Sequence, residues 1–276
     1  MKRTNVIFAA SLLVFATSFS ACQKSETTDP LVDSSQDDDQ VTALYDNVQS
    51  EADEVSSAAA KSPAESADYA MLTSGSGTRT VVKSFSGDTI VRTITFASFI
   101  NGNSLNGHVK NGVIVVKVLG GPLLTQFVKI VTLQNFTIDG NKIEGKTVTT
   151  KTGEHKYSEV LTGGKITLTD GTTYTRAYTH TRTWTAGFDT PLNIWDDVYT
   201  IEGNASGVNR KGNTYTHTIT NPLVIENDCR WIVQGTIELA SNGKTATIDY
   251  GMGTCDDMAT ITINGKTTDI KIKTKR

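Results

Sequence analysis

The sequence predicts an all-β fold: an antiparallel meander forming an extended twisted sheet, or an open sandwich or barrel, preceded by a short amphipathic helix. Two observations predict it. From residue 78 onward, short runs rich in Thr, Val, Ile and Tyr alternate with polar positions, and no helical period persists. Gly and Asn separate these runs with no helix between them, which favours antiparallel pairing of consecutive strands. We expect residues 78–276 to form a single all-β domain.

The first 21 residues have the order of a secretory signal peptide. Two basic residues precede an apolar run over residues 6–19, which is too short to span a bilayer comfortably. Small residues then stand directly before Cys22, and this pattern resembles a bacterial lipobox. The resemblance implies that the chain is cut before Cys22 and that its thiol carries a lipid. The alternative is an ordinary secretory signal.

Residues 22–38 predict an acidic tether. Residues 23–70 carry a net charge of −10, whereas residues 71–276 carry +5. A stretch such as 34–39 buries too little apolar surface to fold, and like charges extend it. Acidic residues soon after a lipidated cysteine also resemble the surface-export signals of Bacteroidota-type lipoproteins. We therefore expect an exported protein anchored in the outer membrane, on the cell surface or the periplasmic face.

Residues 39–62 predict an amphipathic helix, followed by a linker over 63–77. Apolar side chains recur at intervals of three and four at Val41, Leu44, Tyr45, Val48, Ala52, Val55 and Ala59. Asp39 can cap the start of the helix, and Pro63 marks its end. We favour packing of this stripe on the β-domain over binding to a partner helix, because the stripe is short for a coiled coil.

The strands of the β-domain are predicted from its alternating runs. Examples are residues 78–85, 90–100, 113–119, 127–138, 165–169, 172–184, 198–202, 214–220, 230–239, 245–250, 259–263 and 267–273. The pairs Asn242-Gly243 and Asn264-Gly265 suit the positive φ angles of two-residue hairpin turns.

Cys229 and Cys255 are predicted to form a disulfide. With Cys22 assigned to lipid, they are the remaining cysteines of an exported chain, and the cell envelope is oxidising. A two-residue turn at 242–243 leaves them one residue out of register, and we expect a bulge near residues 251–253 to bring them together. The alternative, free or metal-binding thiols, lacks a paired motif such as CxxC.

Residues 140–147 fit the phosphate-loop pattern GxxxxGK[ST], but we reject nucleotide binding. That chemistry requires a helix directly after the loop, whose backbone amides face the phosphates. Here strand-forming residues follow instead, at 148–153. The sequence predicts no nucleotide, no nucleic acid, no metal and no cofactor.

One predicted strand carries a candidate binding face. Its alternate positions are Tyr174, Arg176, Tyr178, His180, Arg182 and Trp184, and the intervening residues are mostly Thr. Successive side chains of a strand point to opposite faces, so the large groups share one face. Aromatic rings beside arginines could bind a glycan. We favour the other interpretation, in which the rings cover a core and the aliphatic parts of the arginines extend outward, so that the guanidinium groups reach solvent.

Two acidic pairs are the other candidate sites. Asp196 and Asp197 lie in one predicted loop, and Asp256 and Asp257 in another. Carboxylates from two loops could hold Ca²⁺ or act as an acid and base pair. We favour turn and capping roles, because no calcium-loop spacing is present. The sequence contains no HExxH or GxSxG motif, so catalytic residues are not assigned.

Several segments resemble Bacteroidota-type exported lipoproteins that have no assigned activity. They are residues 163–167, 170–176, 221–223 and 249–256. The resemblance implies an exported lipoprotein with a β-fold and no mechanism. The leading expectation is a non-catalytic β-scaffold that binds a glycan, another polymer or an envelope protein. The alternatives are a carbohydrate-active or other hydrolytic enzyme with loop carboxylates, and a structural or assembly lipoprotein.

Overall fold

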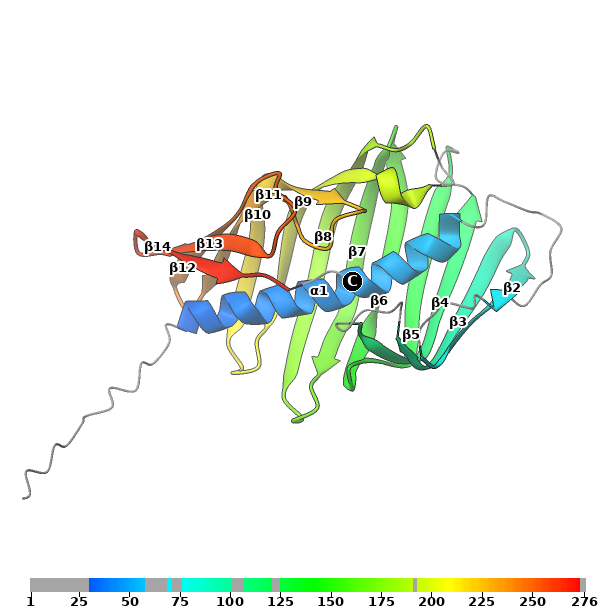
Figure 1. Cartoon of the computed structure of the whole chain (residues 1–276), viewed down its shortest axis with the longest axis horizontal. Helices are drawn as coiled ribbons and strands as arrows, with labels where there is room; N and C mark the ends of the chain where they lie inside the picture. Colours follow the sequence, from blue (N-terminus) through cyan, green and yellow to red (C-terminus); the bar gives the residue numbers. More distant parts are fainter. Residues whose placement is uncertain are drawn as a thin grey trace, which may run out of the picture.

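The computed structural model describes residues 30–57, 69–70, 76–100, 107–120, 125–190 and 193–273. One helix, α1 (Pro30–Ser57), precedes a single sheet (Figure 1). The strands are β1 (Tyr69–Ala70), β2 (Thr78–Ser86), β3 (Thr89–Ile100), β4 (Val109–Gly120), β5 (Phe127–Ile138), β6 (Asn141–Gly153), β7 (Lys156–Thr167), β8 (Thr173–Ala186), β9 (Val198–Val208), β10 (Thr214–Glu226), β11 (Gln234–Ser241), β12 (Lys244–Met252), β13 (Met258–Ile263) and β14 (Lys266–Lys271). A short 3-10 helix, η2 (Ile194–Asp196), lies before β9.

The predicted all-β meander is confirmed. The 14 strands follow one another in sequence order, and each pairs antiparallel with the next. The turns at 242–243 and 264–265 have the expected positive φ angles, which are 52° and 72° at the first and 51° and 77° at the second.

All the predicted runs overlap strands, and the strand-forming residues 148–153 lie in β6, whereas β1 and the first part of β7 are not among the runs. In β6 polar residues stand at inward positions, so the apolar alternation fades: Thr147 and Thr149 are buried there beside Ile143. The segment with the phosphate-loop pattern begins in the β5–β6 turn and continues as β6.

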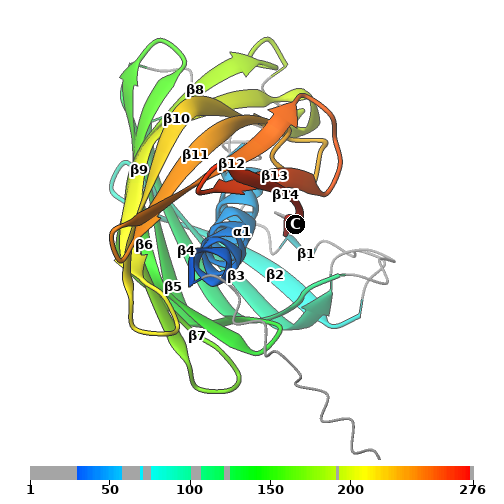
Figure 2. The same cartoon turned by 90° about the vertical axis from the view of Figure 1, so that its left-hand side faces the viewer.

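The sheet is curved into a trough, and α1 lies along its concave side (Figure 2). The sheet does not close, so β1 and β14 are its two edge strands in the part of the chain that the structure describes. Apolar side chains of α1 pack with the strands in two clusters. The larger includes Val48 and Ala52 with β3–β9, and the smaller includes Leu31 with β10–β14. Burial of the apolar stripe of α1 against the sheet stabilises the helix.

The bounds of the helix differ from those expected. It begins at Pro30 and not at residue 39, so most of the predicted tether is helical, and it ends at Ser57. The physical reason for the earlier start is that two acidic side chains of this segment, Asp37 and Asp38, are buried against the cationic groups of Arg210 and Arg176. Of the predicted tether, residues 22–29 lie outside the described residues, as do Ala59, the signal peptide and most of the linker.

The disulfide between Cys229 and Cys255 is present, and the Cα–Cα distance is 5.8 Å. A bulge does separate the pair Thr236–Asp249 from the pair Gln234–Met252. However, it adds a residue to β12, which moves the register away from Cys255. The expectation that this bulge aligns the two cysteines was therefore wrong. Both cysteines lie in loops beyond the ends of β11 and β12, and the loop backbone brings them together.

Candidate functional site

The six predicted face residues of β8 do share one face, the concave one. Tyr174, Arg176, Tyr178 and Trp184 are buried, whereas the Thr side chains between them are mostly exposed. Helix α1 covers this face, so most of it is not available to a polymer. The expectation that the arginine stems lead outward was wrong, because their charges are paired inside the trough.

Arg176 is neutralised by the acidic segment that we had assigned to the tether. Its guanidinium pairs with Asp38, which also contacts His217 Nδ1 at 2.7 Å; all three residues are buried. Burial alone would raise the pKa of Asp38, but the charges of Arg176 and His217 outweigh it and hold that pKa well below its usual range. The preceding residue of the helix, Asp37, pairs with Arg210 at 3.0 Å.

A second group of ion pairs holds the other end of α1. Glu51 Oε1 lies 2.5 Å from Lys110 Nζ, and Glu51 Oε2 lies 3.0 Å from Arg79 Nε. Asp53 accepts from Lys129 and, at 2.8 Å, from Arg182 Nη1. Burial would raise the pKa of Asp53, but these two cations lower it to about 2.

A cleft runs beside the C-terminal half of α1, between the helix and β7–β10. Its cavity volume is about 70 Å³. On the helix side it is lined by Asp46, Gln49, Ser50 and Asp53, and on the sheet side by Glu159, His180 and Arg182. Ile194, Ile201 and Ile225 form an apolar wall. We call this space the lateral cleft.

Several polar groups that line the lateral cleft have no hydrogen-bond partner among the described residues. Gln49 is 6% exposed, and neither its Oε1 nor its Nε2 is paired. The same is true of His180 Nε2 and Arg182 Nε. Burial, with the nearby charges of Arg176 and His217, lowers the pKa of His180 to about 3, so its ring is neutral at pH 7. Buried polar groups are normally satisfied, so these four atoms need an explanation.

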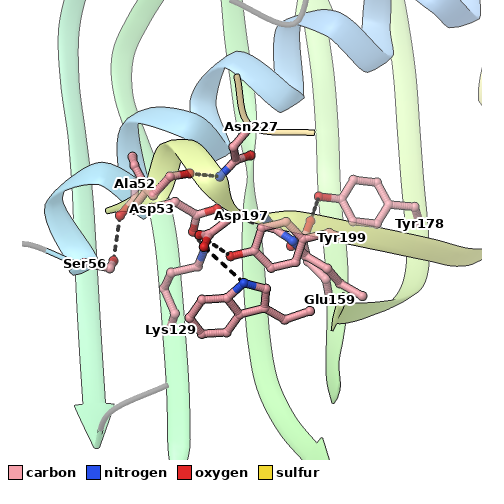
Figure 3. Close-up of polar contacts among 12 residues, drawn as sticks. Ala52, Asp53, Ser56, Lys129, Glu159, Tyr178, Asp197, Tyr199 and Asn227 are labelled. Carbon is pink, nitrogen blue, oxygen red and sulfur yellow. Dashed lines mark hydrogen bonds and ion pairs between the residues drawn. The ribbon is translucent and has the colours of Figure 1, made fainter. Parts of the chain in front are cut away.

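An aromatic region continues the lateral cleft toward the C-terminal end of α1. Its cavity volume is about 90 Å³, and Phe127, Tyr157, Trp184 and Tyr199 line it. Asp197 accepts hydrogen bonds there from Tyr199 OH at 2.9 Å and from Trp184 Nε1 at 3.1 Å. Figure 3 shows Asp197 and Tyr199 close to Lys129 and Asp53. Burial raises the pKa of Asp197 to about 6 despite these hydrogen bonds.

The structure does not gather the acidic pairs into one site. Asp196 accepts from Thr190 Oγ1 at 2.7 Å, while its neighbour Asp197 faces the aromatic region. Asp256 accepts from a backbone amide at 2.9 Å, and Asp257 pairs with Lys271 at the surface. Within the described ranges, no three or more His, Cys, Asp or Glu residues are grouped so that they could hold a metal ion.

The residues of α1 that line the lateral cleft were not selected from the sequence. Gln49 and Asp53 carried no motif, and Asp38 was read as part of a solvated tether. One signal did point toward them, since an acidic segment of −10 preceded a domain of +5. Opposite charges on two segments of one chain are an indication that the segments pack together.

The chain matches no protein-family model, no curated protein and no solved structure. Of the helices in the described part of the chain, none has the length and apolar character needed to cross a membrane. What the protein does must therefore be inferred from its own residues.

Proposed function

We propose that this chain is an exported, lipid-anchored envelope protein that binds a ligand without catalysis, and that the lateral cleft is its binding site. The observation that carries the binding function is the set of buried polar groups without partners that line the cleft, Gln49 first among them. Such groups lose their hydrogen bonds to water on folding, and a ligand with matching groups restores them.

The anchor is proposed from the residues before Cys22, which have the order of a lipoprotein signal and resemble those of Bacteroidota-type lipoproteins. Because α1 begins at Pro30, seven residues separate it from Cys22. An extended chain spans at most roughly 3.6 Å per residue, so these residues reach about 25 Å. The start of α1 would therefore lie close to the outer membrane, on the cell surface or on its periplasmic face.

The anchoring is tested by growing cells with labelled palmitate. Wild-type protein should carry the label and fractionate with membranes, because two or three acyl chains hold a protein firmly. The Cys22→Ser variant should lose both properties. A Cys229→Ser, Cys255→Ser double variant is the matched control and should keep the label. A Cys22→Ser protein that still carries the label would contradict the proposal.

A hydrolytic enzyme is the second candidate function, and Asp197 favours it. A carboxyl group with a pKa of about 6 is suited to act as an acid or base near neutral pH. It lines the aromatic region, where a substrate could reach it. The test is turnover of glycan substrates: loss of activity in Asp197→Asn, with an unchanged unfolding midpoint, would favour the enzyme and contradict non-catalytic binding.

A further inference from the structure

The unpaired groups in the lateral cleft are both donors and acceptors. The amide of Gln49 offers one of each, and both lack a partner, so the conclusion does not depend on which way the amide is turned. Arg182 Nε is a further donor. An anion could satisfy only the donors, and an ammonium group only the acceptors. A hydroxyl group satisfies both, because it donates and accepts.

The charges around the lateral cleft also favour a neutral ligand. Asp53 pairs with two cations, Lys129 and Arg182, and Glu159 is a second carboxylate on the lining. These four charges balance, and His180 is neutral at pH 7, so the lining favours an uncharged ligand. Glu159 accepts from Tyr178 OH at 2.6 Å, as Figure 3 shows, and a carboxylate has further lone pairs for a ligand hydroxyl.

The dimensions fit one ring and not a long chain. The central part of about 70 Å³ and the aromatic part of about 90 Å³ adjoin, because Asp53, Arg182, Ile194 and Asn227 line both. A closed cavity of roughly 150 Å³ holds benzene, so a sugar ring with its hydroxyls would occupy both parts. The apolar wall and the aromatic part suit the C–H faces of a sugar, while the polar lining faces its hydroxyls.

We infer that the lateral cleft binds one uncharged, hydroxyl-rich ring, either a free sugar or a terminal sugar unit of a glycan, and that Gln49 is the main polar contact. This inference rests on the proposed binding function and names its ligand class. Only the end of a glycan fits, since α1 and the sheet enclose the rest of the concave face.

The probes are the methyl glycosides of glucose, galactose and mannose, with glucosamine and glucuronate as charged counterparts of one ring. Binding to the full-length protein in detergent is followed by calorimetry and by ligand NMR, which also reports any chemical change of the sugar. At least one neutral glycoside should bind, and the best one should bind at least tenfold more tightly than glucuronate. A glycan that ends in the same sugar then distinguishes a free ligand from a terminal unit.

Gln49→Leu should weaken this binding about tenfold, the cost of losing a hydrogen bond of roughly 1.4 kcal/mol. It should not lower the unfolding midpoint, because it removes a buried amide that has no partner in the fold and keeps the side-chain volume similar. Gln36→Leu is the matched control: Gln36 is on the same helix but exposed, so binding should stay within about twofold.

Each other outcome decides one point. Tighter binding of glucosamine than of every neutral ring would overturn the ligand class and leave the binding function standing. Conversion of the sugar would overturn the non-catalytic function and keep the ligand class. Failure of all the probes to bind would overturn the ligand class. If, in addition, Gln49→Leu destabilised the protein, the amide would be part of the fold, and the cleft would be rejected as the binding site.

Discussion

Two regions of α1 differ in how their polar side chains are satisfied: the positions that carry ion pairs and the position of Gln49. Asp38, Glu51 and Asp53 contact cationic side chains of the sheet. Gln49, which lies between Asp38 and Glu51, is buried, yet its amide has no partner among the described residues. Two of these four side chains, Gln49 and Asp53, line the same cleft although their hydrogen bonding differs.

This difference separates two uses of polar residues within one helix. A buried charge is tolerated only when it is paired, so the ion pairs fix where α1 lies in the trough. A buried neutral amide is less costly, and a protein retains one without a partner at a binding site more readily than in a core. Mutation of the ion-paired Asp38 should therefore affect folding, and mutation of Gln49 should affect binding.

The largest effect is expected from Asp38→Ala. The variant leaves Arg176 buried without its carboxylate partner, which should cost about 3–5 kcal/mol of unfolding free energy. Urea unfolding followed by tryptophan fluorescence measures it. Replacing Arg176 by Met in the same chain should recover part of the loss, since the uncompensated charge is then gone. A loss under about 1 kcal/mol for Asp38→Ala would mean that the ion pairs do not hold the helix.

A smaller, pH-dependent effect is expected at Asp39, which accepts a hydrogen bond from the backbone of Lys273 at 2.6 Å. Burial and the nearby charge of Asp38 raise the pKa of Asp39 from 3.8 to about 7. Between these values the folded protein holds a proton that the unfolded chain has lost, so this group makes stability fall as pH rises from about 4 to 7.

Asp39→Asn should remove that dependence. Its unfolding midpoint relative to wild type should be a few degrees higher at pH 8 than at pH 5. The midpoints are compared between wild type and the variant because His180, which both contain, has the opposite effect. Its lowered pKa makes stability rise with pH between about 3 and 6.5, and this contribution cancels in the difference. Parallel pH profiles for the two proteins would show that Asp39 ionises as it does in the unfolded chain.

The smallest effect is expected from Asp257→Asn, at the exposed ion pair with Lys271. Both side chains are in contact with solvent, where such a pair contributes at most about 1 kcal/mol, and salt screens it. Unfolding in low and high salt should show a small loss that disappears at high salt. A loss of unfolding free energy as large as that of Asp38→Ala would contradict the expectation that buried pairs contribute more than exposed ones.

Much of the fold was predictable because the information is local. Alternation along β8 placed Tyr174 and Trp184 on one face, and the Asn-Gly pairs fixed two hairpins. The disulfide could be predicted from the cysteine count, although its route could not. The lateral cleft was not predictable, since it joins α1 to strands more than a hundred residues away, and Gln49 has no local feature that distinguishes it.

The sequence by itself determined the strand order, the helix and the segregation of charge, because these depend on periodicity, turn chemistry and composition. Only the tertiary structure decided that the acidic segment lies inside the curved sheet. A run of carboxylates is solvated when alone and buried when cations face it, and those cations come from β2, β4, β5 and β8. Which group a charge pairs with, and therefore its role, depends on contacts between residues that lie far apart in the sequence.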